Sequence, residues 1–224
     1  MKNDELMNEF GIDSVINELK ENRKIFVSEA DFQLSMACVI ERMYPQAKVR
    51  LEYCPCFNDS MHIDILVLWG SDDKKQWIPI ELKYKTKKIK HEDDDGCVCN
   101  LKDQSAQDWG CYDYFKDIER IETISEEKQF KEGYAIFLTN DSYYISGRVN
   151  EGSKHANFIL SGGDGEPRRI NAGQIDSQIT KRPNPIQIKN NYDLKWKQYS
   201  DIGNGGKNNK FSILVVRIPP RQDI

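Results

Sequence analysis

Three ionisable residues stand in runs where apolar side chains predominate. The stretch HIDILVLW (residues 62–69) places Asp64 inside an apolar run, and QWIPIELKY (residues 76–84) places Glu81 and Lys83 near its end. Burial of an unpaired charge is costly, so such side chains require a partner or a function. Two carboxylates beside one ammonium suit a divalent cation, because the cation relieves the repulsion between the acids.

A phosphodiester is the substrate that suits such a group. Mg²⁺ prefers oxygen ligands, takes few of them from the protein, and leaves positions for water and a substrate phosphate. The cation stabilises charge on a phosphoryl group and lowers the pKa of a bound water. Lys83 would orient or deprotonate that water, or offset charge in the transition state.

These residues can meet only if both runs are strands. Residues two apart on a strand share a face, so Glu81 and Lys83 point one way while Ile80 and Leu82 point into the opposite, apolar layer. The connection GSDDKK between the two runs is short, which predicts that the two strands are adjacent. Asp64 would then converge with the other two.

Periodicity along the chain predicts a mixed α/β order. Ser28 is a candidate N-cap with Asp31 at the capping-box position, and Pro45 ends the helix that follows. We expect further helices at 4–21 and 104–124, and strands at 48–54, 62–69, 76–84 and 134–140. The expected fold is a mixed central sheet flanked by helices.

No repeat and no clean linker divides the chain, so residues 1–224 are expected to form a single domain. Within it we expect an N-terminal helix in residues 1–24, a core in 25–145 and a β-rich extension in 146–224. In that extension DLKWKQYSDI and FSILVVRIPP are predicted to pair as strands across a Gly/Asn loop.

Composition narrows the class of protein. Charged residues make up 30% and hydrophobic residues 38% of the chain, which is typical of a globular domain. The net charge of −4 argues against general coating of nucleic acid but leaves room for a local basic track. No apolar run of membrane-spanning length and no secretory signal is present, so we expect a cytoplasmic protein with no membrane partner.

The segments HID and IELKYK together resemble the D…(D/E)-x-K signature of the PD-(D/E)xK, or restriction-endonuclease-like, nuclease superfamily. The resemblance spans roughly residues 25–140 in the order α-β-β-β-α-β. It implies a restriction-endonuclease-like core of three αβα layers. It also implies a nuclease, more specifically an endonuclease, that uses Mg²⁺ or Mn²⁺ and acts on DNA in preference to RNA. A homodimer is implied as well, because restriction-like nucleases that cut both strands commonly pair.

The resemblance also assigns roles to residues. Asp64 and Glu81 would bind the metal together with the Leu82 carbonyl, and Lys83 would be the catalytic lysine. Glu29, in the segment SEADFQ, matches the helix glutamate that often supports such sites.

Two departures from the family pattern are visible. Ile63 stands where a proline often precedes the first acid, and Pro79 lies inside the second strand, where it cannot donate a ladder hydrogen bond. Either pairing is interrupted at Pro79 or the regular strand begins after it.

Other interpretations stay open. Glu81 and Lys83 also fit a solvent-facing strand edge, and Glu29 is favourable in the first turn of any helix. A catalytically inactive nuclease-fold protein that binds nucleic acid or a partner protein is one alternative function. An α/β interaction domain, with the acids and the lysine in a surface ion-pair network, is another.

A basic segment follows the motif. Five lysines fall within residues 83–90, followed by four acids. Lys85, Lys87 and Lys88 either track a phosphate backbone or belong to a solvated loop. Arg120 is a further candidate for phosphate binding, although its spacing from Asp113 and Asp117 favours salt bridges along a helix.

Six cysteines include the pairs CPC and CVC. One intervening residue is shorter than the usual spacing of structural zinc ligands, so we favour reduced thiols over a zinc site. Cys38 is expected in the core.

Overall fold

A six-stranded mixed sheet forms the centre of the computed structural model, which describes residues 9–70, 74–93, 96–149, 152–163, 165–203 and 206–221. The strand order is β1-β2-β3-β6-β12-β11. Neighbours are antiparallel except β3 and β6, which are parallel. The strands are β1 (Lys48–Tyr53), β2 (Ile63–Trp69), β3 (Gln76–Lys85), β6 (Gly133–Thr139), β11 (Trp196–Asp201) and β12 (Lys210–Ile218).

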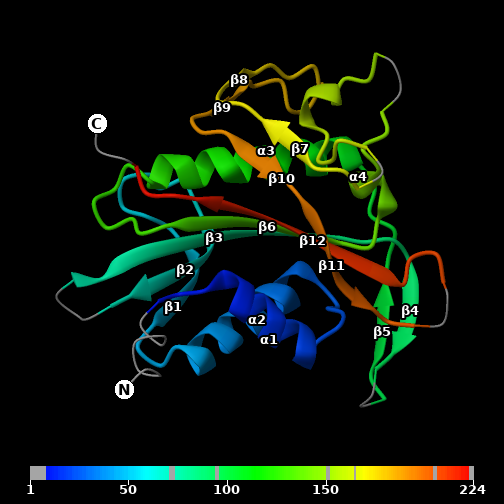
Figure 1. Ribbon diagram of the computed structural model, residues 1–224, viewed down its shortest axis with the longest axis horizontal. Coiled ribbons are helices and arrows are strands. Elements are labelled where there is room, and N and C mark those ends of the chain that lie inside the picture. The colour runs from blue at the N-terminus through cyan, green and yellow to red at the C-terminus, as the bar shows by residue number, and fades with distance from the viewer. Residues whose placement is uncertain are drawn as a thin grey trace.

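Helices cover both faces of this sheet, which confirms the expected mixed α/β class (Figure 1). Helices α1 (Ile12–Asn22) and α2 (Glu29–Met43) pack on one face, and α3 (Gln107–Ile124) packs on the other. The short helix α4 (Ser142–Ser146) follows β6. No helix in the described part of the chain is long and apolar enough to cross a membrane.

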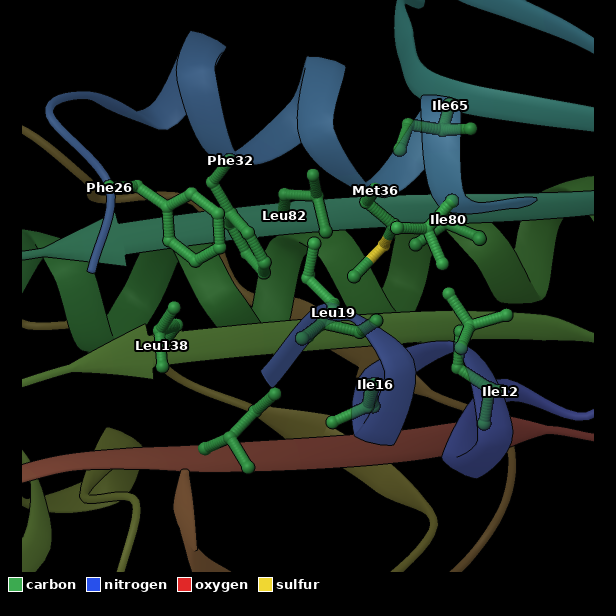
Figure 2. Close-up of a cluster of buried hydrophobic side chains, with 14 of the residues drawn as sticks. Ile12, Ile16, Leu19, Phe26, Phe32, Met36, Ile65, Ile80, Leu82 and Leu138 are labelled. Carbon is green, nitrogen blue, oxygen red and sulfur yellow. The ribbon is translucent and has the colours of Figure 1, made fainter. Parts of the chain in front are cut away.

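The side chains of β3 alternate between the two faces of the sheet, as the sequence predicts. Figure 2 shows Ile80 and Leu82 of β3 pointing toward side chains of α1 and α2, including Leu19 and Met36. Residues one position away therefore face α3. This places Glu81 and Lys83 on the α3 side of the central sheet, opposite the larger apolar cluster.

The start of each N-terminal helix has a local cause. The Ser28 hydroxyl accepts a hydrogen bond from the Asp31 amide at 3.1 Å, which confirms Ser28 as the N-cap of α2. Gly11 is the N-cap of α1, which begins at Ile12, later than expected. Residues 4–8 of the expected helix lie outside the described residues.

Pro79 does not interrupt the pairing of β3 with β2, because the register continues through the pair Leu66–Pro79. On the other edge of β3, Trp77 exchanges backbone hydrogen bonds with Gln129 and Lys131, whereas pairing with β6 begins only at Ile80. Residues two apart present their amides to the same side. The missing amide of Pro79 therefore falls in this gap. The strand is continuous through Pro79, so both alternatives raised by the sequence are wrong for the pairing with β2.

A hairpin begins at the end of the basic segment, after the irregular residues 86–88. Strands β4 (Ile89–Glu92) and β5 (Val98–Leu101) pair antiparallel, and the CVC segment lies largely in β5. The hairpin projects beyond the end of the central sheet (Figure 1). Sequence patterning missed it because each strand has only four residues and charges interrupt the alternation.

The C-terminal part differs from the expected extension. Strands β11 and β12 pair with each other as predicted, but β12 also pairs with β6 along Ser212–Ile218. It therefore completes the central sheet. The remaining segments lie over the α3 face: the 3-10 helix η3 (Ala156–Phe158) and strands β7 (Arg168–Ile170), β8 (Gly173–Ile175), β9 (Ile186–Ile188) and β10 (Tyr192–Leu194).

Candidate active site

The candidate site lies where the β2–β3 ladder ends. The last paired residues in this direction are Ile65 and Ile80. Beyond them the Leu82 amide donates to Asp64 Oδ2 at 2.6 Å, and the Tyr84 amide donates to Glu29 Oε2 at 2.7 Å. Two carboxylates thus replace the missing strand partner, and they bring β2 and the start of α2 to the same stretch of β3.

Glu81 is buried in the interior of the sheet, with 1% of its side chain exposed. The Arg120 Nη1 group donates to Glu81 Oε2 at 2.6 Å, while Oε1 has no hydrogen-bond partner among the described residues. Burial raises the pKa of Glu81 well above its usual value, Asp117 and Asp64 raise it further, and Arg120 opposes them. The alternative of a solvent-facing strand edge is therefore wrong for Glu81.

Lys83 is paired with an acid from α3. Its Nζ lies 2.7 Å from Asp117 Oδ2 and donates to the Leu82 carbonyl at 3.3 Å. Burial lowers the pKa of Lys83, but nearby carboxylates, led by Asp117, outweigh burial and leave it above the usual value. Lys83 is therefore a cation throughout the neutral range. A charged Lys83 suits orienting water or offsetting charge, and the roles expected from the sequence stay predictions.

Asp117 links the two cations of the site. Its Oδ1 lies 3.2 Å from Arg120 Nη1, so Glu81, Arg120, Asp117 and Lys83 form a continuous ionic chain between β3 and α3. Burial raises the pKa of Asp117 to about 6, against the effect of Lys83 and Arg120.

The helical salt bridge predicted on α3 is present for Asp117 and Arg120. Asp113 instead binds Arg182, at 2.7 Å. Sequence analysis missed the contact of Asp117 with Lys83. The only signal for it was an acid on the face of a helix expected to pack on the sheet.

A second contact missed by sequence analysis holds the backbone of Asp64 from α2. The Gln33 side chain of α2 donates to the Asp64 carbonyl at 2.6 Å and to Glu52 Oε1 at 2.7 Å. Glu52 has a φ of 50°, in the left-handed region that costs energy for a residue with a side chain. It lies between the paired positions Leu51–Ile65 and Tyr53–Ile63, directly opposite Asp64.

The oxygen atoms of the site are ligands of the kind that a hard divalent cation prefers. Four carboxylates (Glu29, Asp64, Glu81 and Asp117) surround two cations, which leaves a formal charge of −2. Burial also raises the pKa of Asp64. Within the described ranges no group of three or more His, Cys, Asp or Glu side chains is placed to hold a metal. A cation here would rely on Asp64, Glu81 and the Leu82 carbonyl, with water for the rest, as Mg²⁺ commonly does.

The basic candidates follow the site along the chain. Lys85 is half-buried and lies on the same face of β3 as Lys83. Lys87 Nζ lies 3.4 Å from Asp141 Oδ2, while the Lys88 side chain is exposed before β4. Nucleic-acid binding by these lysines stays a prediction.

All six cysteines are free thiols. Cys38 is exposed on α2, so the expectation that it lies in the core is wrong.

Comparison with known proteins gives no further support: no family model, no curated protein and no solved structure matches this chain.

Proposed function

We propose that this protein is a metal-dependent nuclease of the PD-(D/E)xK type, which hydrolyses phosphodiester bonds with DNA as the favoured substrate. One observation carries the proposal. At the end of the β2–β3 ladder, the carboxylates of Asp64 and Glu29 bind the amides of Leu82 and Tyr84. On the same stretch of β3, Lys83 Nζ donates to the Leu82 carbonyl at 3.3 Å, so contacts of three predicted site residues fall on Leu82 and Tyr84.

Each residue has a role in the proposed reaction. Asp64, Glu81 and the Leu82 carbonyl would hold Mg²⁺ or Mn²⁺, which supplies Lewis-acid stabilisation of charge on the phosphate. Lys83, kept positive by Asp117, would orient the attacking water and offset negative charge in the transition state. Glu29 positions the end of β3 through the Tyr84 amide.

A catalytically inactive nuclease-fold protein that binds nucleic acid or a partner protein is the second candidate. It is favoured by the ion pairs of Glu81 and Lys83 with α3, which occupy both motif residues. The buried, unpartnered Oε1 of Glu81 favours the enzyme, because ion pairing alone gives no reason to leave that atom unsatisfied. A surface ion-pair network fits poorly, since the side chains of Glu81 and Asp117 are 1% and 3% exposed.

Cleavage assays separate these candidates. Supercoiled plasmid and single-stranded RNA are incubated with the protein and Mg²⁺ or Mn²⁺, with EDTA as the metal-free control. Lys83→Ala is expected to lower the cleavage rate by at least about 100-fold, as for loss of a charge-stabilising group. Lys116→Ala is the matched control, because Lys116 is a half-exposed lysine of α3 that pairs with Glu119. Intact polynucleotides with every ion would remove the nuclease proposal.

A folding control is needed because Lys83 is the partner of buried Asp117. Lys83→Arg keeps the positive charge near Asp117 but moves the donor atoms, so it is expected to fold and still lose most of the cleavage. If both Lys83 variants fold and cleave like the unaltered protein, Lys83 does not have the assigned role.

A further inference from the structure

The contacts around Glu81 create a conflict for a metal ligand. Its Oε2 already accepts a hydrogen bond from Arg120 at 2.6 Å, and its Oε1 is buried without a partner. A guanidinium cannot lose its proton in a protein, so Arg120 cannot become neutral when a second cation arrives. Two cations on one carboxylate repel each other, so a cation bound at Glu81 weakens the hold of the guanidinium on it.

We propose that Arg120 is a built-in counter-ion of Glu81 that a divalent cation displaces when it binds. This inference rests on the proposed cation site and describes its regulation. In the cation-free protein, Arg120 neutralises Glu81 and holds α3 against β3. On cation binding, the guanidinium leaves Glu81 and becomes more accessible.

Arg120, and not Lys83, is the cation able to move. The Arg120 side chain is 29% exposed, whereas Lys83 is 16% exposed. Arg120 also has a second anchor, because Asp117 Oδ1 lies 3.2 Å from its Nη1. The guanidinium can therefore swing off Glu81 without leaving its charge unpaired. The same movement frees it for phosphate binding, which the sequence left as the less favoured role of Arg120.

Chemical labelling of the unaltered protein tests this displacement directly. Phenylglyoxal, which reacts with accessible arginines, is applied in EDTA and in saturating Mg²⁺, and each labelled peptide is quantified by mass spectrometry. Arg182 is a matched control: it pairs with Asp113 of the same helix at 2.7 Å and is 34% exposed. Labelling of Arg120 is expected to rise several-fold in Mg²⁺ while that of Arg182 stays constant. Equal labelling of Arg120 in both conditions overturns the inference.

Metal affinity gives a second readout that does not depend on cleavage. Binding of Mn²⁺, followed by electron paramagnetic resonance, is expected to be on the order of tenfold tighter in Arg120→Gln, because a charged hydrogen bond no longer competes. Arg182→Gln should bind Mn²⁺ like the unaltered protein. Unchanged affinity in a folded Arg120→Gln variant overturns the inference, as does a lack of Mn²⁺ binding by the unaltered protein. If Arg120→Gln does not fold, the labelling result decides.

The two proposals can fail separately. Displacement of Arg120 by Mg²⁺ without cleavage of any polynucleotide supports this inference and removes the nuclease. Cleavage with Arg120 protected at saturating Mg²⁺ supports the nuclease and removes the inference.

Discussion

Asp117 joins both cations of the site, with one carboxylate oxygen on Lys83 and the other on Arg120. The motif residues alone do not account for this arrangement, because Glu81 and Lys83 lie on the same strand and each reaches α3 separately. An acid outside the motif therefore helps to fix where the Lys83 side chain lies and keeps it charged.

Replacement of this acid is expected to be destabilising. Asp117→Asn leaves two largely buried cations without their shared carboxylate, which costs about 3–5 kcal/mol of unfolding free energy in comparable buried pairs. Asp113→Asn is the matched control on α3, because its pair with Arg182 is about one third exposed and worth less than about 1 kcal/mol. Urea denaturation of both variants measures the difference. Equal losses would show that burial of the Asp117 network contributes little.

The sequence predicts Asp64, Glu81 and Lys83 as site residues because side chains alternate between the two faces of a strand. The spacing of residues along the chain therefore shows which of them share a face. It does not predict the partner of Lys83. That contact depends on how α3 packs across β3, which is a property of the whole sheet. The sequence also does not predict the contacts of Gln33 with Asp64 and Glu52, because these residues come from three different elements, α2, β2 and β1.

At the scale of elements, the distance between α3 and the sheet depends on one glycine. A methyl group at Gly133, the first residue of β6, would lie 2.3 Å from Cγ2 of Ile121 on α3 and 3.2 Å from Cγ of Pro79 on β3. The helix that carries Asp117 and Arg120 can approach β3 this closely only because β6 begins without a side chain.

Gly133→Ala is therefore expected to destabilise the protein by about 1–3 kcal/mol through overpacking. It should also weaken Mn²⁺ binding if α3 shifts away from β3. Gly11→Ala is the steric control, because its new methyl group would meet nothing closer than 3.4 Å and the backbone φ of −125° suits alanine. Its cost is limited to about 1 kcal/mol, for the poorer N-cap of α1. Thermal unfolding of both variants gives the comparison, and a Gly133→Ala variant as stable as Gly11→Ala would contradict this account of the packing.

Elements with strong local signals are found from the sequence, and those held by distant contacts are not. Ser28 has a capping hydroxyl and an apolar helical face after it, so α2 is predictable. The β4–β5 hairpin lacks such signals. Its base is held by side chains from elsewhere: the Asn140 carboxamide accepts from the Lys87 amide, and Asp103 accepts from the Lys88 amide.

At the scale of the whole molecule, the position of β12 is the main feature that the sequence does not show. Two apolar segments were expected to pair as a terminal hairpin, and they do. Nothing in their composition indicates that β12 also lies against β6, because antiparallel pairing between distant segments depends on which sheet edge is free. As a result, the part of the chain with the motif residues supplies only β1, β2, β3 and β6 of the six-stranded sheet.

A shortened chain tests this dependence. Ending the chain at residue 145 removes β12, whose buried residues pack into both cores: Phe211, Ile213, Leu214, Val216 and Ile218. Loss of their burial costs on the order of 10 kcal/mol, which is comparable to the whole stability of a domain. It also leaves β6 as an open edge with unpaired backbone groups.

The shortened chain is therefore expected to show no cooperative thermal transition by circular dichroism and to bind no Mn²⁺, whereas the full chain should show both. A folded fragment with residues 25–145 intact would mean that the C-terminal strands are dispensable for the sheet that positions Glu81 and Lys83. In that case β12 would belong to a dispensable extension, as the sequence predicts for residues 146–224, and the site would depend only on contacts among β2, β3, α2 and α3.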